Sequence, residues 1–436
     1  MPSDARRVAL EVLRRTFEQA AYTDRAFQAA AHGLGQRDRA LAMRLAYGAV
    51  QRRATLDHLI ECCAERPVAK LDPLVAGALR LGAYELCFTH DAEHAAVNDT
   101  VELARGSRGQ ALVNAVLRRL AREKTQLLAA LDDRTPAGAA TLHSVPRWLA
   151  EEWFESLGAD DARALLARCN EPAEHALRAN TLVTDAADLA AALDVQTTLP
   201  GDPPEAVIVR GQFDAHGSPL WSAGHFMPQS RASMLSAHAL DPQPGDRVLD
   251  MCAAPGAKTT HLAALMHDRG TITAIERHKG RAAALRATIA RMMVHIAHVE
   301  VADVGELPTN GPQFGCVLLD APCSGLGTIH SRPDLRWRVS PDTVQVLASE
   351  QARLLSAAAL ATAPGGKLVY STCTISAAEN ERQIGAFLDE QQQFQAIDLE
   401  PLFPAWRHPR GGGQLLALPH VQGSDGFFVA ALRREG

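Results

Sequence analysis

The feature that most constrains the fold is an alternation of short apolar segments with helical patterns, which begins near residue 236. The apolar segments are typical of strands and cover 247–251, 271–276, 298–303, 316–320 and 367–372. The amphipathic stretches between them predict helices over 258–266, 278–292, 342–362 and 376–390. Strands that alternate with helices in this way form a parallel, doubly wound sheet. We therefore expect an α/β domain with a mostly parallel sheet over residues 236–436.

Two further domains are expected before this one. Residues 1–135 carry apolar stripes at helical spacing and predict an all-α domain. The polar stretch 131–138 contains Pro and Gly and predicts a linker. Over 140–235, short helices mix with strand-like pieces such as 206–210, which predicts a small α+β domain that connects or positions the substrate.

The composition is that of an ordinary globular chain, with 47% hydrophobic and 22% charged residues. An apolar signal-peptide core and an uninterrupted run of membrane-spanning length are both missing from the sequence, so we expect a cytoplasmic protein without a membrane segment. The net charge of −6 does not by itself indicate a nucleic-acid binder. Residues 1–140, however, carry 20 Lys and Arg against 17 Asp and Glu. This mild local excess is compatible with contacts to phosphate.

A group of arginines near a glycine-containing turn is the best candidate for such contacts. Arg108 lies within the turn 106–109, and the helical pattern that follows carries Arg118, Arg119 and Arg122 away from its apolar stripe. A single arginine of this kind usually belongs to a solvated helix face. As a group beside a flexible turn, the four are candidate RNA-phosphate contacts.

The eight cysteines do not form a pattern typical of metal binding or disulfide exchange. They stand at positions 62, 63, 87, 169, 252, 316, 323 and 373, without a CxxC pair. We accordingly expect no bound metal. Most should be small buried residues with inert thiols. Cys323 and Cys373 differ, because each lies where a predicted strand gives way to a turn.

The first predicted strand is followed by a turn of small residues, 252–258, which contains Gly256 and ends at Lys258. Such a turn lets the backbone approach a ligand closely. Its residues fit neither the dinucleotide-binding GxGxxG pattern nor the phosphate-binding GxxxxGK[ST] pattern, which disfavours NAD and ATP. Glu276, at the end of the second strand, can accept hydrogen bonds from ribose hydroxyls. Asp303, at the end of the third, can accept one from an adenine amino group.

Cys323 and Cys373 follow the fourth and fifth strands, and the carboxyl ends of parallel strands meet at one edge of a sheet. Two thiols there suit methylation of a cytosine at carbon 5, which is too weak a nucleophile on its own. A thiolate that adds to carbon 6 activates carbon 5, and a base must later remove the carbon 5 proton. Lys258 can lower the pKa of a thiol, and Asp320 can bind the N3/N4 edge of the ring. The base must leave its stack to be reached.

These residues resemble the RsmB (Fmu/Sun) branch of the NOL1/NOP2/Sun family of RNA cytosine-5 methyltransferases. The segments that carry the resemblance are LDMCAAPGAKTT (249–260), LDAPCSGLG (319–327), YSTCT (370–374) with Glu379-Asn380, SDGFF (424–428), HSVPRW (143–148), LRANT (177–181), AAVNDTV (95–101) and LVNAVL (112–117). Together they extend over essentially the whole chain. The resemblance implies a NusB-like helical RNA-binding domain and a Rossmann-like methyltransferase domain.

The resemblance also implies individual roles. Cys373 matches the family's nucleophile, and Cys323 matches the cysteine that assists product release. The positions that match contacts to S-adenosyl-L-methionine are Cys252, Ala253, Ala254, Pro255, Gly256, Ala257, Lys258, Glu276, Asp303 and Asp320. The implied substrate is a cytosine of 16S rRNA, free or in a small-subunit assembly intermediate, and we expect the enzyme to act as a monomer. No metal and no membrane partner are expected.

Four positions depart from the family pattern. Ala257 replaces a usual Gly, Glu276 stands where Asp is commoner, His278 where a second acid is frequent, and Ser230 where an acid usually follows Gln229. The first two should adjust cofactor affinity without abolishing it. The other two concern the edge of the substrate or cofactor site.

Alternatives remain open from the sequence. The DNA cytosine methyltransferases attack with the cysteine of a Pro-Cys pair, which would make Cys323 the nucleophile. The target could be another rRNA or tRNA site. A NusB-like domain could also dominate in a non-catalytic RNA-binding factor. A methyltransferase for amino groups is disfavoured, because residues 320–323 lack the Asn/Asp-Pro-Pro-aromatic pattern.

Overall fold

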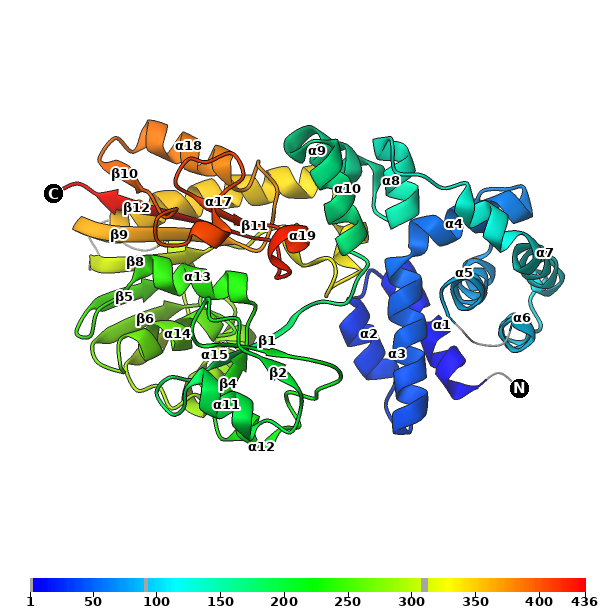
Figure 1. Ribbon diagram of the computed structural model, residues 1–436, viewed down its shortest axis with the longest axis horizontal. Coiled ribbons are helices and arrows are strands. Elements are labelled where there is room, and N and C mark those ends of the chain that lie inside the picture. The colour runs from blue at the N-terminus through cyan, green and yellow to red at the C-terminus, as the bar shows by residue number, and fades with distance from the viewer. Residues whose placement is uncertain (1–2, 90–92, 307–312) are drawn as a thin grey trace. The chain divides into compact units, whose positions relative to one another are not determined.

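The computed structural model describes residues 3–89, 93–306 and 313–436 (Figure 1). The chain divides into two compact units. The first, called the helical unit below, comprises Met1–Glu171 together with Ile329–Val339. The second, the α/β unit, comprises Pro172–Thr328 together with Ser340–Gly436.

The helical unit confirms the prediction of an all-α domain at the N-terminus. Its helices are α1 (Asp4–Glu18), α2 (Thr23–Ala30), α3 (Gln36–Gln51), α4 (Arg53–Ala64), the 3₁₀ turn η1 (Val68–Lys70), α5 (Pro73–Phe88), α6 (Glu93–Leu103), α7 (Gln110–Ala129), α8 (Pro136–His143), α9 (Arg147–Leu157), α10 (Ala159–Arg168) and α16 (Leu335–Arg338). Helix α5 is buried on most sides and starts where the sequence favours it. Pro73 occupies its first turn, and the Asp72 side chain accepts the amide of Leu74.

The predicted linker over 131–138 is wrong in its second half. The Thr135 side chain caps α8 by accepting the Gly138 amide, and Pro136 occupies the first turn of that helix. Helix α8 is tied to α4, because the Thr55 hydroxyl donates to the carbonyl of Thr141 at 2.6 Å. The helical unit therefore extends to Glu171, beyond the boundary expected near 135.

A short segment from the C-terminal half of the sequence belongs to the helical unit and is anchored there by Arg336. This side chain is fully buried. Its guanidinium donates to the carbonyls of Gln51, Ser144, Cys169 and Ile329 and to the side-chain oxygen of Asn170, at 3.0–3.3 Å. A planar guanidinium with five donors can serve several loops in this way. Burial lowers the pKa of Arg336 to about 10.

The α/β unit begins with a four-stranded antiparallel sheet in the order β2-β3-β1-β4, which corresponds to the expected small α+β domain. Its elements are β1 (His175–Ala179), α11 (Ala186–Ala192), β2 (Thr197–Thr198), β3 (Ala206–Val209), α12 (Pro219–Ser222) and β4 (Phe226–Pro228). Arg178 on β1 is buried and donates to the Ala257 carbonyl and to the Thr260 hydroxyl, both at 2.8 Å. The small sheet is thereby fastened to the chain that follows the turn of small residues.

The larger sheet has the order β10-β12-β9-β8-β5-β6-β7, with β11 paired to β12. Its elements are α13 (Arg231–Leu240), β5 (Arg247–Asp250), α14 (Ala257–Leu265), β6 (Thr271–Ile275), α15 (Lys279–Arg291), β7 (Ala297–Glu300), η2 (Val304–Glu306), β8 (Phe314–Asp320), η3 (Leu326–Thr328), α17 (Pro341–Ala361), β9 (Thr362–Thr372), α18 (Glu381–Glu390), β10 (Phe394–Ile397), η4 (Pro404–Trp406), β11 (Leu415–Ala417), α19 (Pro419–Gln422) and β12 (Phe427–Arg434). Strands β5 to β9 are parallel, and β10, β11 and β12 pair antiparallel. The predicted mostly parallel Rossmann-like sheet is confirmed.

The strand order has a switch point between β5 and β8. From β5 the chain proceeds outward through β6 and β7, then returns to the other side of β5 and continues through β8 and β9. Right-handed crossovers place α14 and α15 on one face of the sheet and α17 on the other (Figure 1). Ligands bind beyond the carboxyl ends of the strands at such a point. The ends of β5, β8 and β9 are therefore where the site should lie.

Within the described residues, none of the helices is long and apolar enough to cross a membrane.

The role of Arg336 predicts a specific loss of stability. Arg336→Leu would leave several buried oxygens without donors, and we expect a loss of about 3 kcal/mol in the free energy of unfolding of the helical unit. Urea unfolding followed by circular dichroism would measure it. Arg332→Leu, at an exposed position of the same segment, is the matched control and should change stability by about 0.5 kcal/mol or less. Equal midpoints for both variants would contradict the anchoring role.

Candidate active site

The turn of small residues lies directly beyond β5. Gly256 has φ 106°, a conformation that side-chain-bearing residues rarely adopt, and α14 begins at the next residue. Asp250, at the end of β5, is fully buried and accepts a hydrogen bond from the Thr259 hydroxyl at 2.7 Å. Burial raises the pKa of Asp250 to about 7. This hydrogen bond ties the end of β5 to the first turn of α14 and so fixes the two ends of the turn of small residues.

Lys258 and Asp320 join the two strands at the switch point. The Lys258 ammonium donates to one carboxylate oxygen of Asp320 at 2.8 Å, and the Ser371 hydroxyl donates to the other at 2.8 Å. Lys258 also lies 5.0 Å from the centre of the Phe427 ring. The ends of β5, β8 and β9 are therefore linked through one carboxylate.

The structure brings Cys323 and Cys373 together, with their sulfur atoms 3.3 Å apart. Asp320 on β8 is in register with Ser371 on β9, so the residues that follow the two strands emerge side by side. The Gly327 amide donates to the Cys373 carbonyl at 3.0 Å, which closes the Pro-Cys loop against the end of β9. Both side chains are partly exposed.

The two thiols share a proton unequally. Either sulfur can be the donor in this contact; with Cys323 as the donor, the hydrogen bond lowers the pKa of Cys373 below that of an ordinary cysteine, and the Lys258 charge contributes in the same direction. The same contact and burial raise the pKa of Cys323 well above the ordinary value. Cys373 is accordingly the member of the pair that ionises first.

A buried carboxylate behind the cysteines, Glu379, belongs to a motif quoted above but was not predicted as a site residue. Glu379 accepts the Ser324 amide at 2.8 Å, the Ser324 hydroxyl at 2.5 Å and the Gln351 side-chain amide at 3.0 Å. Burial raises its pKa. Glu379 thereby fixes the residue that follows Cys323. The sequence places Glu379 in the segment after Cys373, but it does not reveal the contacts of Glu379 with Ser324 and Gln351.

The two predicted strand-end acids lie where the sequence placed them, but with different surroundings. Glu276 follows β6 and is buried; its carboxylate accepts the His278 amide at 2.8 Å and lies 3.4 Å from the Arg281 guanidinium. Arg281 also donates to the Ala254 carbonyl at 2.8 Å, a contact to the turn that the sequence did not predict. Asp303 lies beyond the end of β7 and accepts the Gly305 amide at 2.8 Å, which lowers its pKa. Its carboxylate also pairs with Arg353 at 3.0 Å.

Two of the four positions that depart from the family pattern, Ala257 and His278, contact other residues of the site through their backbone atoms. The Ala257 carbonyl accepts a hydrogen bond from Arg178, and the His278 backbone supports Glu276. Ser230 precedes α13 at its N-cap position, without a capping hydrogen bond from its side chain.

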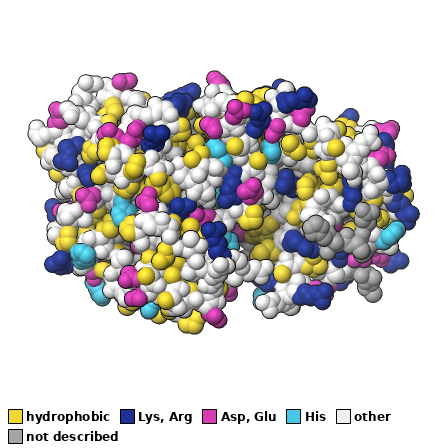
Figure 2. Space-filling view, viewed as in Figure 1, with side chains coloured by type: hydrophobic (Ala, Val, Ile, Leu, Met, Phe, Trp, Pro, Cys, Tyr) yellow, Lys and Arg dark blue, Asp and Glu magenta, His cyan; other side chains and the backbone are white. Residues whose placement is uncertain are grey.

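The four candidate RNA-contact arginines lie in the helical unit. They differ in their exposure and in whether acidic side chains already pair with them. Arg108, Arg118 and Arg122 are exposed, and Arg118 also bonds the Asn114 side chain at 2.8 Å. Arg119 pairs with Glu65 at 2.8 Å and with Glu123 at 3.1 Å, so its charge is already balanced. In Figure 2, basic side chains are interspersed with acidic ones on the face shown. Arg119 is thus the weakest of the four candidates.

A doubly wound sheet with a small-residue turn at its switch point, followed by strand-end acids, defines the class of Rossmann-like methyltransferases. Comparisons with known proteins agree with this class. Residues 237–433 match the family of the 16S rRNA methyltransferase RsmB/F, residues 3–122 match the NusB family, and residues 145–214 match the ferredoxin-like domain of RsmF/B-like methyltransferases.

Individual relatives match over the full length. A probable ribosomal RNA small subunit methyltransferase B from Synechocystis is 37% identical, with 99% of each chain covered. The crystal structure of PH0851 is 28% identical with a TM-score of 0.80, over 100% of this chain and 99% of that one. The structure of NSun6 from Pyrococcus horikoshii with SFG shares the fold at 23% identity and a TM-score of 0.62, over 68% of this chain and 100% of that one. The chain belongs to the RsmB/F family of 16S rRNA methyltransferases.

The unequal pair of thiols predicts a pH dependence. Because the pKa of Cys373 is lowered, its thiolate is present at a lower pH than that of an ordinary cysteine, and alkylation by iodoacetamide should reach its plateau earlier as the pH rises. Cys323→Ala removes the thiol donor and should shift this profile to higher pH. Peptide mass spectrometry would follow each cysteine separately.

The internal control is Cys252, on the turn of the same site. Burial raises its pKa, so it should remain unmodified where Cys373 reacts. Preferential modification of Cys323 at neutral pH would contradict the assignment.

Proposed function

We propose that this enzyme transfers a methyl group from S-adenosyl-L-methionine to carbon 5 of a cytosine in 16S rRNA, through a covalent bond between Cys373 and carbon 6. The observation that carries the proposal is the pair of thiols 3.3 Å apart, one of them with a lowered pKa, at the switch point of the sheet. A methyltransferase for an oxygen or an amino group needs no such pair, whereas a cytosine carbon needs both attack and release.

Cys373 performs the attack. Its thiolate forms a bond to carbon 6, and the electrons of the carbon 5–carbon 6 double bond make carbon 5 nucleophilic. The cofactor supplies the electrophilic methyl group that carbon 5 takes up. Removal of the carbon 5 proton then restores the double bond, and the bond to Cys373 breaks with the sulfur leaving as a thiolate.

Cys323 assists the release. Its sulfur lies next to that of Cys373, on a loop fixed by Glu379 through Ser324. A group in this position can take part in proton transfer while the adduct breaks down. Without it, Cys373 would remain bonded to the RNA.

Asp320 and Lys258 orient the base and tune its charge. The Asp320 carboxylate is held on both sides, by Lys258 and by Ser371, and is 30% exposed, so it can still accept a hydrogen bond from the N4 amino group. The Lys258 ammonium contributes positive charge beside the attacking sulfur. This fixed arrangement does not need to reorganise when charge develops on the ring.

The residues at the strand ends fit S-adenosyl-L-methionine. The turn 252–258 offers backbone groups at the N-terminus of α14, and Gly256 supplies the left-handed conformation with which the chain enters that helix. Glu276 is a buried carboxylate one residue beyond β6, where ribose hydroxyls are bound in sheets of this kind. Asp303 would bind the adenine amino group, although Arg353 already occupies one of its oxygens.

The substrate is proposed to be 16S rRNA, free or in an assembly intermediate, and to be bound with the help of the NusB-like part of the chain. Arg108, Arg118 and Arg122 are the candidate phosphate contacts. Such a substrate implies a cytoplasmic enzyme, which we propose to act as a monomer.

Cysteine variants test the chemistry. With undermethylated small-subunit rRNA and tritiated cofactor, we expect Cys373→Ser to reduce methyl transfer to background. With RNA that contains 5-fluorocytosine, Cys373→Ser should fail to form a covalent adduct on a denaturing gel. Cys323→Ser should instead accumulate an enzyme–RNA adduct on ordinary RNA.

Cys62→Ser is the matched control, since Cys62 lies in the helical unit and should leave both assays unchanged. The opposite pattern for the two site variants would make Cys323 the nucleophile. Good RNA binding without any methyl transfer by the unmodified enzyme would favour the alternative of a non-catalytic RNA-binding factor.

Cofactor binding is tested at Glu276. Loss of hydrogen bonds to a buried carboxylate costs about 1.5–3 kcal/mol, so Glu276→Ala should weaken binding of S-adenosyl-L-methionine about tenfold to a hundredfold. Isothermal titration calorimetry would measure the affinity. Glu300→Ala, at the exposed end of the neighbouring strand β7, is the control. Equal affinities for both variants would argue against the ribose contact.

A further inference from the structure

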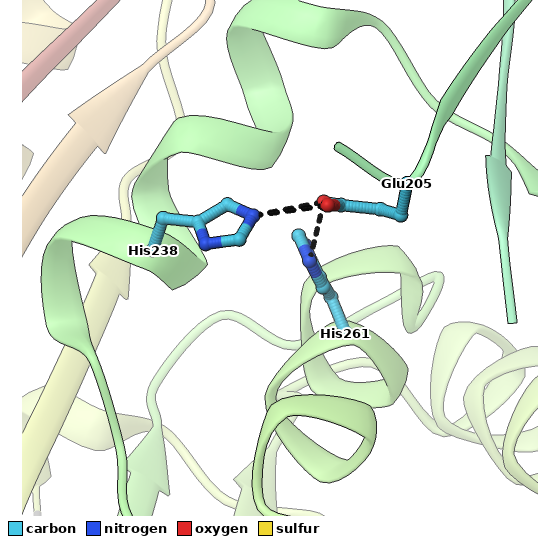
Figure 3. Close-up of side chains that lie close together, drawn as sticks. All are labelled: Glu205, His238 and His261. Carbon is cyan, nitrogen blue, oxygen red and sulfur yellow. Dashed lines mark hydrogen bonds and ion pairs between the residues drawn. The ribbon is translucent and has the colours of Figure 1, made fainter. Parts of the chain in front are cut away.

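Three side chains that play no part in the proposed reaction converge inside the α/β unit (Figure 3). Glu205 immediately precedes β3 of the small sheet, His238 lies on α13, and His261 lies on α14. Their ligand atoms all lie within 4.8 Å of one another. The cluster therefore connects three elements that are far apart in the sequence.

Both histidine rings lie close to one carboxylate oxygen of Glu205. The Nε2 atom of His238 is 3.0 Å from Oε1 of Glu205, and the Nε2 atom of His261 is 2.8 Å from the same oxygen. In Figure 3 both rings turn a nitrogen toward that oxygen. Two imidazole nitrogens and one carboxylate oxygen are typical protein ligands of Zn²⁺.

The orientation of His261 distinguishes the cluster from a simple hydrogen-bonded triad. This ring is 2% exposed, yet neither of its nitrogens makes a hydrogen bond with acceptable geometry. Its Nε2 atom lies 2.8 Å from the Glu205 carboxylate, but this close approach does not have the geometry of a hydrogen bond. In a metal site each ligand points at the ion, so neighbouring ligand atoms are close without being aligned with one another.

The electrostatic surroundings decide which ion would fit. The cluster has one carboxylate and the Arg178 charge nearby, a poor environment for Mg²⁺ or Ca²⁺, which need several oxygen ligands. An ion that prefers imidazole is favoured.

We propose that Glu205, His238 and His261 form a structural Zn²⁺ site that fastens the small antiparallel sheet to helices α13 and α14. His238 is the most exposed of the three, with 22% of its side chain accessible, and leaves room for water as a fourth ligand. Helix α14 begins at the turn of the candidate active site. The ion would thus hold that helix at its middle, through His261.

Metal analysis of the full-length enzyme tests the site. The protein is purified without a histidine tag or chelators, and zinc is measured by plasma mass spectrometry after gel filtration. We expect about one zinc per chain, lost in His261→Gln and in Glu205→Gln. His295→Gln is the matched control, because His295 lies on the surface, where its ring pairs with Asp268 at 2.6 Å, and zinc should be retained.

A second measurement covers variants that fold poorly. Adding Zn²⁺ to metal-free protein should raise the melting temperature of the unmodified chain and of His295→Gln, but not that of His238→Gln, whose site is partly exposed. Co²⁺ bound in place of Zn²⁺ should give the visible absorption of a tetrahedral site. The proposal is overturned if the unmodified chain neither contains zinc nor is stabilised by it, or if His238→Gln retains both properties.

Discussion

The contact on which the site depends is the hydrogen bond between Lys258 and Asp320. It spans the switch point of the sheet and connects the first residues of α14 to the end of β8, while Ser371 brings β9 into the same network. A buried ion pair contributes little net stability, because desolvation offsets much of the attraction. Its value here is geometric: it fixes the relative positions of the turn of small residues and of the ends of β8 and β9, beyond which Cys323 and Cys373 lie.

The parts of the fold that depend on local pattern could be predicted from the sequence. Strands β5, β6, β8 and β9 have apolar runs bounded by turns, and the proximity of Cys323 to Cys373 follows from parallel pairing alone. Some element ends were predicted wrongly: α18 begins at Glu381, so the first third of the helix predicted over 376–390 is not helical. The start of α8 was also readable, since Thr135-Pro136 is a favourable helix beginning, but the Gly nearby suggested a linker.

What could not be predicted depends on contacts between distant segments. Glu379 becomes important only because Ser324 and Gln351 fold against it. The expectation of no metal rested on cysteine spacing, which cannot reveal a cluster built from Glu205, His238 and His261. Arg178 belongs to the segment 177–181 that carries the family resemblance, but its burial against the chain that follows Gly256 could not be read from that motif. In each case the decisive information is three-dimensional, and one sequence contains no direct record of it.

Residues 329–339 are inserted into the helical unit from the α/β unit, and this has a consequence for the engineering of the chain. The polypeptide leaves the α/β unit just after the Cys323 loop, contributes α16 to the helical unit, and returns at Ser340. The two parts are therefore interlaced rather than joined by one hinge, and no single cut separates them. A fragment that ends at Glu171 would lack the guanidinium that its loops surround, and the complementary fragment would keep only the Ile329 carbonyl among the acceptors of Arg336 described above. Exchange of the N-terminal part between relatives would succeed only if this short insertion were exchanged with it.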